Sequence, residues 1–492
     1  MNLKLFEGHP TGLRVLFFTE MWERLSYYGM RGILVLFMVD QMRGGMGMDT
    51  ENAAAIYGLY TALVYLLALP GGWVADHILG QQRAVFLGGC VIAAGHFSMA
   101  IPGDITFYLG LILIVLGTGL LKPNVSTIVG ELYPEGGARR DAGFSIFYMG
   151  INVGALAGPL ICGYLGEEIN WHLGFSAAGI GMVLGLIQYR YGLRHLGDAG
   201  LLKDVTTEEQ RRAIRGFIYG VGTLVGIGVL LAVLHNLDIF RLTLTGVAHS
   251  TTVIIVAIAV LYFLYIIFVH GMAQKQLNSL EIKRVIVIFF LFVGAALFWS
   301  GFEQAGSSMN LFAERLTNRV LMGMEVPASW FQSVNPLFII LLAPVFGSLW
   351  VSLDRMNKEP SIPVKFGLGL LQLGVAFLVL AWASTYASET SPVSPMWLVV
   401  TYFLQTTGEL CLSPVGLSSV TKLSPRHLTG QMMGIWFMGS ALGNLIAGLL
   451  AGQFEKLPLP ELFGAVALIT AGSGLLFLLF SRLIQKMIGD IK

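Results

Sequence analysis

Long apolar runs dominate this sequence. A helix that crosses a lipid bilayer needs roughly 20 mostly apolar residues, and runs of that length follow one another along the whole chain with only short connections between them. Because 55% of the residues are hydrophobic and only 12% are charged, a water-soluble core would lack its polar cover. We therefore predict an all-α polytopic membrane protein. Its fourteen expected spans are residues 13–39, 52–75, 82–101, 105–130, 141–165, 172–193, 213–235, 247–269, 284–312, 329–353, 363–386, 396–421, 428–453 and 461–487.

The remaining composition excludes several other classes of protein. The chain has 61 glycines, which suit the close packing of helices in lipid. Its three cysteines are odd in number and lie in apolar runs, so we expect no disulfide framework. A net charge of +1 argues against nucleic acid as a partner. Walker A, H-E-x-x-H and G-x-S-x-G motifs are missing, so we expect no enzyme, no metal and no ATP hydrolysis.

Basic residues are distributed unequally between the connections. If the first residues and every second connection share one side of the membrane, that side holds 22 of the 30 Lys and Arg residues. The other side holds five, and the remaining three, Arg24, Arg31 and Lys122, lie within spans away from their ends. Lysine and arginine concentrate on the cytoplasmic side of membrane proteins. The sequence therefore predicts an even number of spans, with both termini in the cytoplasm.

The first span carries a polar stripe. At 100° per residue its polar side chains fall within an arc of about 140°, which leaves the rest of the helix apolar. Such a face lines either an aqueous cavity or a buried polar network. A residue near a helix end can instead extend its charge to the interface, which remains an alternative for Glu20 and Arg31. The stripe consists of Glu20, Glu23, Arg24, Tyr27, Tyr28 and Arg31.

Other spans also carry buried charges and interrupting prolines. An ionisable side chain at mid-membrane costs about 2.5–3.5 kcal/mol, so it normally faces a partner or a water-filled path. Polar helices broken near the midplane indicate the binding site of a transporter. Because both charge signs occur together with aromatic residues, a zwitterionic ligand is favoured over a stream of one ion, although a channel remains an alternative. These positions are Lys122 before Pro123, Trp299, Glu303 and Gln304, Asn335 before Pro336, and Tyr402, Gln405, Glu409 and Ser413 on one helix face before Pro414.

Together these residues resemble the signatures of the proton-dependent oligopeptide transporter family (POT or PTR), a branch of the major facilitator superfamily. The resemblance extends over essentially the whole chain. It also implies the organisation of that family's bacterial members: a six-helix bundle over 1–193, a linker with two additional transmembrane helices over 194–283, and a second six-helix bundle over 284–492. The matching segments are Glu20–Gly29 (E-x-x-E-R-F-x-Y-Y-G), Phe147–Gly154 (F-Y-x-x-x-N-x-G), Gly119–Asn124, Phe298–Gln304 and Gly408–Pro414.

The resemblance implies inward symport of di- and tripeptides with protons by alternating access, with no cofactor besides the protons and in a monomer embedded in lipid. The implied proton-coupling group is Glu20, Glu23 and Arg24. The implied peptide-binding residues are Arg24, Lys122 and Tyr28 for the carboxylate, Glu409, Asn152 and Asn335 for the amino terminus, Tyr65, Trp299 and Trp436 for the side-chain pockets, and Ser413 beside them. The implied gates are the ion pairs Arg31–Glu303 and Lys122–Glu409.

Some features depart from the family pattern and narrow these expectations. Leu25 replaces the signature phenylalanine, and Gly58 stands where animal members carry a histidine, so proton coupling must rest on carboxylates. The short connection 386–396 lacks the large extracellular domain of animal members, which points to a bacterial inner membrane. Two alternatives remain open: transport of another anion on the same fold, and a receptor that binds peptide without moving it.

Overall fold

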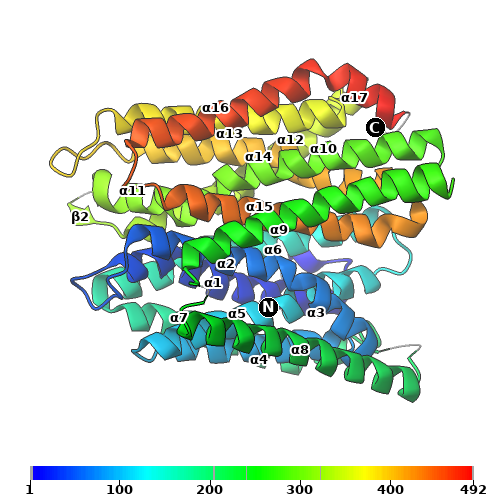
Figure 1. The fold of residues 1–492 in the computed structure, drawn as a ribbon, viewed down its shortest axis with the longest axis horizontal. Helices are drawn as coiled ribbons and strands as arrows, with labels where there is room; N and C mark the ends of the chain where they lie inside the picture. Colours follow the sequence, from blue (N-terminus) through cyan, green and yellow to red (C-terminus); the bar gives the residue numbers. More distant parts are fainter. Residues whose placement is uncertain (1–3, 203–204, 240, 322, 490–492) are drawn as a thin grey trace.

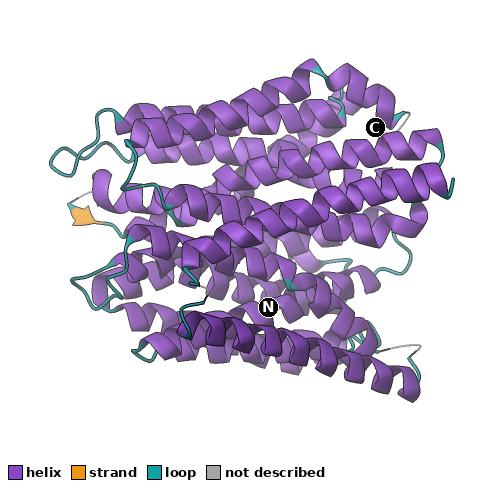
Figure 2. Ribbon diagram, viewed as in Figure 1, coloured by secondary structure: helices purple, strands orange, loops and turns teal. Residues whose placement is uncertain are grey.

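The computed structural model describes residues 4–202, 205–239, 241–321 and 323–489, and nearly all of this length is helical (Figure 2). The elements in chain order are η1 (Lys4–Phe6), α1 (Thr11–Val39), α2 (Thr50–Leu66), α3 (Ala68–Val74), η2 (Ala75–Leu79), α4 (Gln81–Met99), α5 (Asp104–Glu131), α6 (Gly137–Gly163), η3 (Tyr164–Ile169), α7 (Trp171–Gly192), η4 (Leu193–His195), α8 (Thr207–Asn236), α9 (Leu244–Tyr265), η5 (Ile266–Ala273), α10 (Ser279–Phe302), η6 (Glu303–Gly306), α11 (Ser308–Leu316), β1 (Val320–Leu321), β2 (Met324–Glu325), η7 (Ala328–Ser333), α12 (Val334–Arg355), α13 (Ile362–Ser384), α14 (Met396–Leu423), η8 (Arg426–Leu428), α15 (Thr429–Ala451), α16 (Leu459–Leu479) and α17 (Ser481–Ile488).

Each of the fourteen predicted runs lies on helical segments. Some runs include a 3-10 or π-helical turn, such as η7 in 329–353 and η5 in 247–269, and three others are divided by a break. The run 52–75 divides at Leu67 into α2 and α3, where Pro70 has no N–H to donate to the carbonyl of Leu66. The run 284–312 divides at η6, and Ser307 after it has a non-helical backbone. The run 461–487 divides at Phe480 into α16 and the amphipathic α17.

The helices of the structure that are long and apolar enough to span a membrane are fewer than the fourteen predicted runs. Within the described residues, eleven helical segments are long and apolar enough to cross a membrane. The predicted runs 13–39, 82–101 and 396–421 correspond to α1, α4 and α14, which fall outside this set. For α1 the reason is its own polar stripe, because the helix carries five charged side chains.

The long helices form two groups that pack side by side (Figure 1). In the first group α1 packs against α6 and α7, and α4 packs against α5 and α7. In the second, α13 packs against α14 and α16, and α10 packs against α15. The groups meet where α2 packs on α15 and α6 on α12. We call them the N-half and the C-half.

The helices α8 and α9 belong to neither group. Helix α8 buries none of its residues and contacts the N-half at η2, where Gln210 Nε2 donates to the carbonyl of Ile78 at 2.7 Å. Helix α9 packs along α15 and α2, so it covers one seam between the halves (Figure 1). The predicted division of the chain into two six-helix bundles, 1–193 and 284–492, and a linker, 194–283, stays a prediction.

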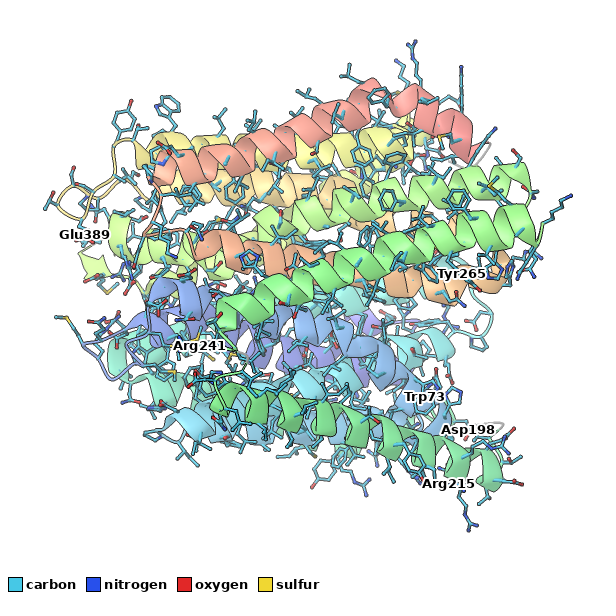
Figure 3. The ribbon with its side chains drawn as sticks, viewed as in Figure 1. Trp73, Asp198, Arg215, Arg241, Tyr265 and Glu389 are labelled. Carbon is cyan, nitrogen blue, oxygen red and sulfur yellow. The ribbon has the colours of Figure 1, made fainter. Side chains whose placement is uncertain are left out.

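A two-stranded antiparallel hairpin is an exception to the all-α prediction. In it Val320 pairs with Glu325 and Leu321 with Met324. The hairpin marks the left end of the molecule in Figure 1, which we call the hairpin end, and α3 lies toward the opposite end, the α3 end. Glu389 lies at the hairpin end, whereas Asp198 and Arg215 lie at the α3 end (Figure 3).

A proline and a glycine join α3 to α5. Pro123 lies inside α5 and lacks the N–H that would bond the carbonyl of Gly119, four residues earlier. At that carbonyl Gly71 of α3 approaches so closely that a β-carbon on it would lie 2.0 Å from Gly119 O. Asn124 strengthens the contact, because its Nδ2 donates to the carbonyl of Gly71 at 3.3 Å. The lack of a side chain at Gly71 therefore sets the distance between these helices next to Lys122.

We predict that Gly71→Ala lowers the free energy of unfolding by about 1–3 kcal/mol, because the new methyl group meets a backbone oxygen that cannot rotate away. Thermal unfolding in detergent measures the effect. The matched control is Gly464→Ala in α16, where a β-carbon would meet nothing within 4 Å. Equal melting temperatures for the two variants would contradict this explanation of the packing.

Candidate functional site

A cavity of about 170 Å³ lies between the two halves. Its walls combine aromatic rings, amides and two carboxylates, contributed by α1, α2 and α6 from the N-half and by α10, η6, η7, α12 and α14 from the C-half. The lining residues are Tyr28, Arg31, Tyr65, Tyr148, Ile151, Asn152, Ala155, Trp299, Phe302, Glu303, Ala305, Gln332, Asn335, Pro336, Ile339, Tyr402, Gln405, Glu409 and Ser413.

Arg24 on α1 forms a buried cluster with two acids. Its Nη2 lies 2.7 Å from Glu20 Oε1, one helical turn away, and its Nε donates to the same oxygen at 2.8 Å. Arg24 Nε also lies 3.2 Å from Glu23 Oε2. Neither oxygen of Glu23 has a hydrogen-bond partner among the described residues, although the side chain is fully buried. One guanidinium thus shares its charge between two carboxylates, and the second carboxylate keeps free acceptor sites.

Arg31, two turns further along α1, joins the two halves. Its Nη2 lies 2.8 Å from Glu303 Oε2 in the C-half, and its Nε donates to the hydroxyl of Tyr57 at 2.6 Å. The rings of Tyr28 and Tyr57 lie 5.4 and 5.7 Å from the guanidinium carbon. Both members of the ion pair are buried. Because a buried charge is costly without its partner, this pair holds the halves together here.

Lys122 and Glu409 carry opposite charges on opposite halves. The ammonium of Lys122 lies 3.8 Å from the centre of the Tyr65 ring, and Tyr65 lines the cavity. Glu409 Oε2 accepts a hydrogen bond from Asn335 Nδ2 at 3.2 Å, and the same amide donates to Thr406 Oγ1 at 2.9 Å. In the described part of the chain no salt bridge joins Lys122 or Glu409 to any residue, so the predicted inner gate pair stays a prediction.

Contacts between the halves also close the hairpin end beyond the cavity. Arg315 and Thr50 donate to the carboxylate of Glu455 and hold its pKa below the ordinary value, so this contact is ionised at neutral pH. The further contacts across this end are Asn310 Nδ2 to Gly32 O at 2.8 Å, Gln332 Nε2 to Gly32 O at 3.2 Å, Trp330 Nε1 to Leu160 O at 3.0 Å, Ser333 Oγ to Leu156 O at 2.8 Å, and Lys456 Nζ to Glu51 Oε2 at 2.5 Å.

Toward the α3 end the cavity continues between the halves. A second cavity of about 540 Å³ lies between α6 and α12 and shares Tyr148, Asn152 and Ile339 with the first. Its other walls include Ala343, Pro344 and Gly347, which are further along α12 toward the α3 end. The site is therefore closed at the hairpin end, and a second cavity adjoins it toward the α3 end.

The structure brings together most of the predicted binding and gate residues at this cavity. Tyr28, Tyr65, Asn152, Trp299, Asn335, Glu409 and Ser413 line it, together with Arg31 and Glu303. The predicted residues that do not line it are Glu20, Glu23, Arg24, Lys122 and Trp436. Trp436 is buried between α14 and α13: a β-carbon on Gly416 would lie 2.2 Å from its ring, and the Phe366 ring centroid is 6.4 Å away.

Some lining residues were not among the predicted site residues. Tyr402 and Gln405 share the predicted polar face with Glu409, so the sequence contained the signal for both. Tyr148 lies within the matched segment Phe147–Gly154, where the motif singled out Asn152. Gln332 comes three residues before Asn335 in an apolar run, and that spacing places both on one helix face.

Two halves of long helices around a charged, partly enclosed cavity define a polytopic membrane protein of the transporter class. Comparisons with known proteins specify the family. The family model described as the POT family matches residues 82–466. The chain is 42% identical to "Peptide transporter YePEPT" of Yersinia enterocolitica, over 97% of this chain and 95% of that protein. It is 37% identical to the "Di-/tripeptide transporter" of Lactococcus lactis subsp. cremoris, over 99% and 98%.

A solved structure agrees with this assignment. The crystal structure titled as the peptide transporter POT in complex with sulfate superimposes with a TM-score of 0.89, at 43% identity, and covers 98% of this chain and 96% of that chain. The chain belongs to the POT family. This membership in a family of transporters, rather than enzymes, confirms the resemblance seen in the sequence motifs.

For the Arg31–Glu303 pair we predict a strongly non-additive effect on stability. Glu303→Ala leaves Arg31 buried without a carboxylate and should cost about 3–5 kcal/mol, whereas Arg31→Met combined with Glu303→Met should restore most of this loss. Unfolding in detergent measures each variant. Glu135→Gln, which removes one partner of the exposed pair with Arg139, is the control and should change stability by at most about 1 kcal/mol. Additive losses would show that the pair is not coupled.

Proposed function

We propose that this protein is a proton-coupled symporter that imports di- and tripeptides across the cytoplasmic membrane of a bacterium by alternating access. In this proposal the chain crosses the membrane fourteen times with both termini in the cytoplasm, and the hairpin end faces outward. It acts as a monomer in lipid, with protons as the coupling ion and no other cofactor. The asymmetry of basic residues supports the orientation, and the names of the relatives from Yersinia and Lactococcus support the substrate class.

One observation carries the proposal: a cation and an acid on opposite halves, one behind the cavity-lining ring of Tyr65 and one in the cavity wall, have no salt-bridge partners among the described residues. Lys122 lies against the ring of Tyr65 on the N-half, and Glu409 lines the wall of the C-half. Unpaired charges within a membrane span are costly unless a ligand or water compensates them. A peptide has a carboxylate at one end and an ammonium at the other, so one molecule can compensate both.

The binding roles follow from this polarity. Lys122 and Arg24, assisted by Tyr28, receive the peptide carboxylate. Glu409, with Asn335 and Asn152 beside it, receives the amino terminus. The side-chain pockets are formed by Tyr65 and Trp299, with Ser413 at the C-half wall and Trp436 supporting that wall from behind.

Protons enter this scheme through competition for Arg24. When the site is empty and the acids are ionised, Glu20 and Glu23 share the guanidinium. Protonation of one acid frees part of that charge for the peptide carboxylate, and release of the peptide inward reverses the exchange. The gates alternate in step: Arg31–Glu303, an ion pair in this structure, closes the outer side, and Lys122–Glu409 closes the inner side when the outer side opens.

The test of the peptide site is uptake of labelled dialanine into liposomes with an inward proton gradient. Wild type should accumulate the peptide, and a protonophore should abolish the accumulation. Lys122→Ala should reduce uptake at least tenfold, because the carboxylate loses a half-buried charged partner. Lys358→Ala, which removes an exposed lysine at the end of α12, should transport at the wild-type rate. Uptake by Lys122→Ala at the wild-type rate would show that Lys122 does not bind the peptide carboxylate.

Proton coupling has a separate test in the same liposomes. Glu23→Gln imitates a permanently protonated acid, so it should still exchange labelled for unlabelled peptide in counterflow but should not accumulate peptide against a gradient. Glu389→Gln, in the exposed connection at the hairpin end, is the control and should accumulate peptide normally. Accumulation by Glu23→Gln at the wild-type level would remove this residue from the coupling mechanism.

A further inference from the structure

The helix that begins at Ala328 has no cap of its own. It runs through η7 and α12 from Ala328 to Arg355. The first backbone N–H groups of a helix have no partner within it and are usually satisfied by the side chain of the preceding residue. Here the preceding residue is Pro327, which makes no side-chain cap. The helix therefore depends on another acceptor at its positive end.

The acceptor comes from the other half of the molecule. Glu167 Oε2 accepts from Ala328 N at 2.7 Å, and Glu167 Oε1 accepts from Ser329 N at 3.0 Å. The side chain of Glu167 is 6% exposed, so it is buried between the halves at the hairpin end. A carboxylate that receives two backbone N–H groups at a helix N-terminus is a charge-assisted cap. This one is formed between two segments about 160 residues apart.

The surrounding residues hold Glu167 in place. It lies in η3, a π-helical turn that continues α6, and such turns often reposition side chains at functional sites. Arg43, in the connection after α1, donates from Nη1 to the carbonyl oxygen of Glu167 at 3.1 Å. The two segments also approach closely at Gly163, where a β-carbon would lie 2.1 Å from Ser329 Oγ. The π-helical turn and the Arg43 contact thus hold the backbone from which the carboxylate reaches the helix terminus.

We infer that Glu167 is a positioning residue for transport: by capping the Ala328–Arg355 helix from the opposite half, it favours the conformation closed at the hairpin end. The inference rests on the proposed alternating-access function. When the halves separate at this end, the helix loses its cap and the carboxylate is exposed. Loss of a helix cap changes the equilibrium between capped and uncapped conformations by about fivefold. Glu167 therefore influences how often a molecule without peptide opens at the hairpin end.

The test measures two distances between the halves with spin labels in lipid nanodiscs, on a background in which Cys90, Cys162 and Cys411 are replaced by alanine. One label pair, Ile105→Cys with Met396→Cys, spans the hairpin end at the exposed first turns of α5 and α14. The second pair, Ala142→Cys with Val351→Cys, spans the α3 end on α6 and α12.

Glu167→Gln should raise the ratio of open to closed molecules at the hairpin end about fivefold. The reason is that the amide oxygen accepts only one of the two backbone N–H groups. The distance between the two labels at the α3 end should shorten in the same fraction of molecules. Glu167→Asp, which keeps the charge but shortens its reach, should give an intermediate ratio. The control is Glu168→Gln, which removes the same charge from the exposed neighbouring position and should match wild type.

Wild-type distance distributions in both Glu167 variants would overturn the inference, and broadening at both ends without the opposite shifts would show a merely structural role. If Glu167→Gln does not fold, the distances in Glu167→Asp decide. The proposed function fails separately: wild type without peptide uptake but with shifted distances in Glu167→Gln would refute peptide transport and keep the cap. Uptake by wild type with unchanged distances in the variants would refute the cap alone.

Discussion

Paired charge in an apolar interior is the constraint on which this structure depends. Two arginines of α1 are buried, and each contacts a carboxylate within 3 Å: Arg24 contacts Glu20 on its own helix, and Arg31 contacts Glu303 on the other half. The first pair is local and persists however the halves move. The second exists only while the halves are together at the hairpin end. The same helix therefore combines a charge cluster within one half with an ion pair between the two halves.

Small residues bring the charged groups to their positions. Gly71 lets α3 reach the carbonyl that Pro123 leaves without a donor, next to Lys122. Gly154 plays a similar part between α6 and α1, because a β-carbon there would lie 2.2 Å from the carbonyl oxygen of Met21. Helix packing in lipid depends on such close approaches rather than on a hydrophobic driving force. The abundance of glycine in this chain is thus part of how its cavity is shaped.

Periodicity and the cost of buried charge predict much of the site from the sequence. The stripe on α1 and the polar face of α14 locate Tyr28, Arg31 and Glu409 at the cavity, because residues three or four apart share a helix face. Residue spacing alone could not show which ion pairs join the halves, and the Arg31–Glu303 pair is expected only from the family resemblance. Nor could it connect Glu167 with Ala328: that contact depends on how two distant helix ends meet, and a carboxylate near the end of a span also suits the water interface.

The central claim is that proton and peptide compete for the charge of Arg24, and calorimetry of dialanine binding tests it most directly. Titrations of the purified protein near neutral pH, in buffers that differ in ionisation enthalpy, give the number of protons exchanged on binding. If the peptide carboxylate displaces an acid from Arg24, that acid takes up a proton, so binding should be accompanied by net proton uptake. Saturable binding with the same heat in every buffer would mean that no proton moves with the peptide, and it would contradict the account.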